Sequence, residues 1–200
     1  SNQSFGNYLI AIVDNMIYNT NLVIDYWSVN RESFISNDGN TATSSINKIA
    51  NDFIYFFEKG LRANKIGIPA GRYSSDPLPD RVEAYYKQDV SKELALEALF
   101  ASKNFFVGNH FNQTINSGFS FKDYLEDLNN STLVELIMTQ FNDAESQVNQ
   151  LDNNFVNQIQ KNNNLMLYAF DDIQLLVVSF KVDMLQSLGI SVDYIDADGD

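Results

Sequence analysis

Cysteine is absent from this sequence, and basic residues, proline and histidine are scarce. Without cysteine the chain cannot form disulfides, thiolate metal sites or a cysteine nucleophile, although the cellular compartment stays open. The single histidine, His110, excludes the paired histidines of a zinc-protease helix. A serine triad would depend on the same residue, and no Gly-x-Ser-x-Gly elbow is present. The sequence therefore favours a noncatalytic domain.

The charge balance is strongly acidic, with 13 basic against 26 acidic residues and a net charge of −13. Phosphate backbones and anionic membrane surfaces would repel such a chain, so we expect no nucleic-acid partner. The apolar run at residues 173–180 is far shorter than the ~20 residues that cross a bilayer. No signal peptide is visible, and we expect any export signal or lipid anchor to lie upstream of Ser1.

Apolar residues recur at steps of three and four through most of the sequence, which predicts helices. The last predicted helix is apolar on most of its circumference, so we expect other helices to surround it. The sequence predicts an all-α antiparallel helical bundle of four long helices, short helices and one long irregular loop, in a single domain over residues 1–200. The long helices are expected near 5–27, 44–65, 134–159 and 165–188, and the short ones near 80–86, 92–106 and 120–128.

The irregular loop, residues 66–79, holds all three prolines and is the best loop candidate for a site. Arg62 and Lys65 precede it, where they complement the C-terminal end of a helix dipole. Three helix starts carry recognisable caps. These are Ser91, the pair Ser120 with Asp123, and the pair Thr132 with Glu135.

Two groups of residues are weak candidates for metal binding. The acidic tail places carboxylates at Asp193, Asp196, Asp198 and Asp200, and calcium prefers such oxygens. The calcium-loop pattern is incomplete, however, because it requires a later glutamate, and a frayed terminus is the favoured interpretation. His110 lies in a polar loop without the companion ligands of a metal site, so a plain loop residue is favoured there too.

The order of several short motifs resembles the imelysin-like family over most of the chain. The motifs are Lys65-Ile66-Gly67-Ile68-Pro69-Ala70-Gly71, Val82-Glu83-Ala84-Tyr85, Ser91, Phe106-Val107-Gly108, Asp123-Tyr124-Leu125, Leu188-Gly189-Ile190-Ser191-Val192-Asp193-Tyr194 and Asp198-Gly199-Asp200.

This resemblance implies a bacterial envelope protein of the periplasm or cell surface, often a lipoprotein, that is linked to iron uptake. It also implies an all-α fold of two bundle-like halves with a metal or ligand site between them. The Gly-x-His-x-x-Glu motif of the first half is missing here, although residues 5–27 look like the helix that follows it. We therefore expect this chain to be the second half, with the first half or another envelope protein as its partner.

By resemblance, the ligand-binding residues at that interface are Lys65, Arg72, Glu83, Ser91 and the tail acids Asp198 and Asp200. Local roles are the alternative. Glu83 is then an exposed helix residue and Ser91 an N-cap, and the tail acids dock on a helix N-terminus.

Three hypotheses follow. The preferred one is a noncatalytic envelope domain that helps to bind a metal, such as iron or another divalent metal, or a small ligand in iron acquisition. The second is a fragment of a metallopeptidase, because the family was once described as peptidases. The third is a structural or protein-interaction bundle that presents exposed aromatic residues such as Tyr85, Tyr86, Phe105 and Phe106.

Overall fold

The computed structural model describes residues 2–110 and 118–194, and the regular structure of this part is entirely helical. The prediction of an all-α fold is therefore confirmed. The elements are α1 (Asn2–Ser36), α2 (Ser45–Tyr55), η1 (Phe56–Gly67), α3 (Ile68–Ala70), η2 (Pro79–Arg81), η3 (Tyr85–Val90), α4 (Ser91–Val107), α5 (Phe121–Asp127), α6 (Ser131–Asn149), α7 (Phe155–Asn162), α8 (Asn164–Val178), η4 (Ser179–Met184) and α9 (Leu185–Leu188).

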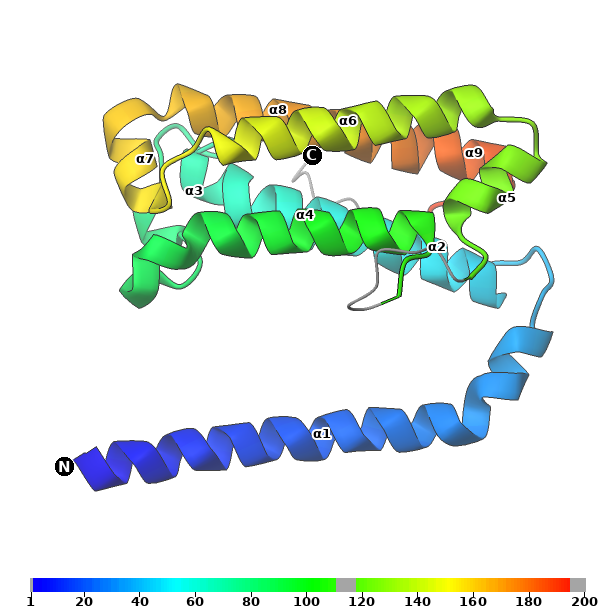
Figure 1. The fold of residues 1–200 in the computed structure, drawn as a ribbon, viewed down its shortest axis with the longest axis horizontal. Helices are drawn as coiled ribbons and strands as arrows, with labels where there is room; N and C mark the ends of the chain where they lie inside the picture. Colours follow the sequence, from blue (N-terminus) through cyan, green and yellow to red (C-terminus); the bar gives the residue numbers. More distant parts are fainter. Residues whose placement is uncertain (1, 111–117, 195–200) are drawn as a thin grey trace.

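Four long helical segments form an antiparallel bundle, which we call the body (Figure 1). These segments are α2–η1–α3, α4, α6 and α8–η4–α9, and α8 packs against both η1 and α6. Each segment contributes one fully buried phenylalanine to a central cluster: Phe57, Phe106, Phe141 and Phe180. Their ring centroids lie 5.3–6.2 Å apart. Burial of these rings is the main source of stability at the centre of the body.

Two of the long segments are π-helical where they cross the middle of the body. Residues of η1 continue α2 without a break, and η4 joins α8 to α9 in the same way. π-helical turns are rare and occur frequently at functional sites, because the wider turn redirects the side chains that it carries.

Helix α1 lies apart from the body (Figure 1). Apart from half-buried Asn30 and Phe34, its described side chains are exposed. Hydrogen bonds at its C-terminal end tie it to α2, since the Ser45 hydroxyl donates to the Phe34 carbonyl (2.6 Å) and the Ser45 N–H to the Asn37 carbonyl (3.1 Å). Within the described residues, no helix is both long enough and apolar enough to cross a bilayer.

The long irregular loop begins later than predicted, because residues 66–70 continue the helix and end it at Gly71 with φ of 80°. Pro69 is accommodated directly after the π-helical segment, where the ordinary hydrogen-bond register is already interrupted. The interpretation of Arg62 as a residue at the end of this helix is wrong, since it lies inside η1 and is buried. The predicted helix at 80–86 is also wrong, because two short 3-10 turns, η2 and η3, flank Val82.

The predicted helix over 134–159 is broken after Asn149. The side chain of Asn154 accepts from the Asn157 N–H (3.1 Å) and starts a separate helix, α7. Of the predicted caps, the pair of Ser120 with Asp123 is confirmed by a 3.1 Å hydrogen bond. The other two predicted caps are wrong, because α6 begins at Ser131 after an N-cap at Asn130 and α4 begins at Ser91 itself, neither with a side-chain cap.

The last helical segment ends at Gly189 as predicted, in the left-handed conformation with φ of 66°. Its inner side is buried in the body. Most of its circumference is buried or half-buried, as expected, but one face is open to solvent. This face carries Tyr168, Leu175, Val178 and Val182.

Candidate functional site

A buried ion pair lies where η1 faces the last helix. Glu58 is 0% exposed and Arg62 is 1% exposed, and the Arg62 Nη2 atom lies 3.4 Å from Glu58 Oε1. The other terminal nitrogen, Nη1, donates to the side-chain oxygen of Gln174 on α8. Transfer of an ion from water into the protein interior costs on the order of several kcal/mol. A buried ion pair is therefore stable only when its other polar atoms also have hydrogen-bond partners.

Lys181 and Tyr194 complete this polar network. The Lys181 Nζ atom lies 3.4 Å from Glu58 Oε2, and the Tyr194 hydroxyl donates to the same oxygen at 2.9 Å. The Lys181 ammonium also lies 5.3 Å from the centroid of the Tyr194 ring. With 18% of its side chain exposed, Lys181 connects the buried pair to solvent. We call Glu58, Arg62, Gln174, Lys181 and Tyr194 the buried polar network.

The two π-helical segments supply the charged members of the network. Glu58 and Arg62 lie one turn apart on η1, and Lys181 lies on η4. Tyr194 reaches the network because the chain after Gly189 is held against α2. There Asn51 donates to the Ser191 carbonyl (3.1 Å) and accepts from the Asp193 N–H (3.1 Å). Residues far apart in sequence thus meet at one carboxylate.

Phe170 links the network to Arg72, one of the site residues predicted from the sequence. The guanidinium carbon of Arg62 lies 5.4 Å from the ring centroid of Phe170, and that of Arg72 lies 5.0 Å from it. Arg72 also pairs with Asp171 at 3.4 Å. Lys65 forms an ion pair with Glu83, so the structure brings these two predicted residues together.

No described contact joins the remaining predicted residues to the buried polar network or to the Lys65–Glu83 pair. Ser91 is buried at the start of α4, where its hydroxyl donates to the Gln88 carbonyl (2.8 Å). Asp198 and Asp200, together with Asp196, lie outside the described residues.

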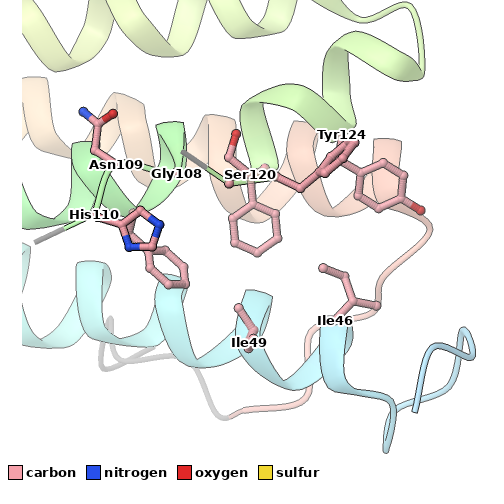
Figure 2. Close-up of a pocket in the computed structure, with 11 residues that line it drawn as sticks. Ile46, Ile49, Gly108, Asn109, His110, Ser120 and Tyr124 are labelled. Carbon is pink, nitrogen blue, oxygen red and sulfur yellow. The ribbon is translucent and has the colours of Figure 1, made fainter. Parts of the chain in front are cut away.

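A hollow of about 480 Å³ lies between α2, the end of α4 and α5 (Figure 2). Ile46 and Ile49 line its α2 side, and His110, Ser120 and Tyr124 lie across from them. The rest of the lining includes the aromatic residues Phe105, Phe119 and Phe121. The exposed His110 ring therefore borders an apolar hollow rather than a group of charged residues.

A family model described as Imelysin matches residues 1–172. The chain belongs to the imelysin family. No curated protein and no solved structure matches it. The match agrees with the resemblance carried by the order of the sequence motifs, and the helical body is the fold of this part of the imelysin chain.

The described residues of this imelysin chain do not fit a bare metal ion. No group of three or more histidine, cysteine, aspartate or glutamate side chains is placed among them to hold one. The buried carboxylate of Glu58 is already contacted by Arg62 and Lys181, which repel a cation.

At Asp172, burial raises the pKa of the carboxyl, and Asp143 and Asp171 raise it further by charge repulsion.

Sequence reasoning missed Glu58, Gln174, Lys181 and Tyr194 as members of one site. A local signal was present in the spacing of Glu58 and Arg62, a charged i, i+4 pair that lies among the apolar positions Phe57 and Leu61. No comparable signal joins them to Lys181 and Tyr194, because those contacts span more than a hundred residues of sequence.

Proposed function

We propose that this imelysin chain is a noncatalytic domain of the bacterial envelope that binds an anionic small ligand, such as an anionic chelate of iron, during iron acquisition. The observation that carries the proposal is the buried polar network. Two cationic side chains, Arg62 and Lys181, converge there on the single carboxylate of Glu58, so the network is cationic overall.

An anionic ligand matches this charge better than a free metal cation does. Lys181 is the partly exposed cation of the network, so we expect an incoming carboxylate to reach it and to accept a charge-assisted hydrogen bond from its ammonium. Arg62 lies behind it and strengthens the positive potential, which falls off slowly in a buried environment. Iron would then arrive as part of the anion, with its ligands supplied by the chelator.

Two other functions are alternatives to this proposal. A metallopeptidase fragment would need a metal site and a general base, and one histidine does not supply them. A protein-interaction bundle is supported by the exposed apolar face of the last helix, which includes Leu175 and Val182. The first half of the family domain or another envelope protein would be the partner in that case.

Thermal unfolding with ferric citrate, citrate alone and ferrous ion as separate additives tests the proposal. At a concentration about one hundred times Kd, binding adds about 2.7 kcal/mol to stability. For a chain of this length that raises Tm by about 5–10 °C. We expect this rise with ferric citrate, and we expect Lys181→Met to abolish most of it.

The matched control is Lys48→Met, which removes an exposed lysine of α2 and changes the net charge by the same amount as Lys181→Met. Binding should persist in that variant. Equal loss in both variants, or no Tm shift with either citrate form, would contradict the proposed anion site. Chelator-sensitive cleavage of a protein substrate by the purified chain would contradict the noncatalytic assignment.

A further inference from the structure

An apolar groove runs along the side of the body between α2–η1 and α4. We define it by Ile46, Ile49, Phe53, Phe56, Ala101 and Phe105, which line two adjoining hollows of about 480 and 400 Å³. Ile49 and Phe105 line both hollows, so the groove is continuous. Phe56 and Phe105 are about half exposed within it. Such a surface gains free energy when another apolar surface covers it.

Helix α1 carries a complementary surface. Its acidic residues Asp14, Asp25 and Glu32 are spaced by eleven and seven residues, so they lie along one side of the helix. The opposite side is apolar and exposed over its full length. It consists of Phe5, Leu9, Ile12, Met16, Val23 and Trp27. When α1 docks through this side, all three carboxylates stay in water.

The groove is continuous with the contact that already joins α1 to the body. Phe34 and Ser45 are hydrogen bonded at the turn, and Ile46 at the end of the groove is the next residue. In Figure 1 the separate helix lies on the same side of the body as α2 and α4. Toward its C-terminal end α1 bends (Figure 1), and the rings of Trp27 and Phe34 there lie 4.9 Å apart.

From these observations we propose that the apolar groove is the docking site for α1 of the same chain. The two helices then form a closed antiparallel hairpin whose turn is residues 37–44. Val23 lies fourteen residues before this turn and Phe56 lies twelve residues after it, so docking places these two residues close together. Docking also moves Trp27 from the solvent into the edge of the groove.

Trp27 is the only tryptophan of the chain, and its fluorescence therefore reports on α1 alone. In the docked state its emission is blue-shifted and acrylamide quenches it weakly. We expect Phe56→Asp, which places a charge in the groove, to raise the quenching constant several-fold. The control Tyr86→Asp, at a fully exposed residue outside the groove, should leave it unchanged. Strong and equal quenching in the natural chain and in both variants would overturn the proposal.

Cysteine cross-linking gives a second test, and a chain without cysteine has no background reaction. We expect the pair Val23→Cys with Phe56→Cys to form a disulfide within one chain roughly tenfold faster than the control pair, since docking raises the effective concentration. The control pair is Asp25→Cys with Phe56→Cys, which places the α1 thiol on the opposite side of the helix. Equal rates would overturn the proposal. Disulfide-linked dimers would overturn it as well, because α1 of a second copy would then occupy the groove.

Discussion

Glu58 depends on its neighbours because its carboxylate is removed from water. It is fully buried and contacts Arg62, Lys181 and Tyr194. We expect Arg62→Met to lower the free energy of unfolding by about 3–5 kcal/mol, because it leaves a buried carboxylate with less compensation. Urea denaturation measures this change.

The double variant Glu58→Leu with Arg62→Met is the informative comparison. Replacement of both partners by apolar groups removes the uncompensated charge, so the double variant should be more stable than Arg62→Met alone. A double variant that loses the sum of the two single effects would contradict this account of the pair.

Asp172 is a second residue whose environment opposes its charge, because burial and the carboxylates of Asp143 and Asp171 raise its pKa. The folded state therefore binds the proton more tightly than the unfolded state, and ionisation destabilises the fold as pH rises through the folded pKa. We expect Asp172→Asn to stabilise the chain by about 0.2–0.5 kcal/mol at neutral pH, the magnitude of an exposed like-charge pair.

This gain in stability should disappear as pH falls below the ordinary aspartate pKa, since residue 172 is then uncharged in the natural chain as well as in the Asp172→Asn variant. Chemical denaturation at a series of pH values measures the difference. Asp38→Asn, in the exposed turn after α1, is the control for the change in net charge. A gain that is independent of pH would show that the effect is not electrostatic.

At the scale of the element, Gly67 at the end of η1 lets the long helix approach its neighbours. A Cβ at this position would lie 2.8 Å from side-chain atoms of both Phe170 and Tyr73. Gly67→Ala therefore forces two packed rings to move, and we expect a loss of about 1–3 kcal/mol in the free energy of unfolding.

Gly6→Ala is the matched control, because a Cβ there would meet nothing within 4 Å and α1 continues helically through the position. Alanine should favour that helix by up to about 1 kcal/mol. Comparison of the two variants by thermal unfolding separates the steric effect from helix propensity. Equal Tm values for both would contradict the close packing at Gly67.

At the scale of the whole molecule, the two proposals concern different surfaces. The anion site depends on the buried polar network between η1 and η4, and the docking of α1 depends on the groove between α2–η1 and α4. Loss of ferric citrate binding would therefore leave the fluorescence of Trp27 unchanged. Failure of α1 to dock would leave the effect of Lys181→Met on ligand binding intact.

The sequence predicted the helices best where the apolar spacing is regular and a strong terminator follows. The segment that ends at Gly189 and the helix that ends at Gly108 are confirmed, since both glycines adopt positive φ. Prediction failed where short polar side chains form hydrogen bonds with backbone groups in place of the helical ones. The apolar spacing continues smoothly across residues 150–154, yet Asp152 accepts from the Asn154 N–H and Asn154 caps a new helix.

The sequence by itself determined the all-α fold, the family and the lack of a cysteine or of a second histidine, because residue types and local spacing carry that information. Only the tertiary structure decided which charges meet. Lys65 and Glu83, both predicted as site residues, form an ion pair. Glu58, which was not predicted, contacts Lys181 and Tyr194, more than a hundred residues later in the sequence. The burial of a charge depends on every helix packed around it, and local sequence does not encode that arrangement.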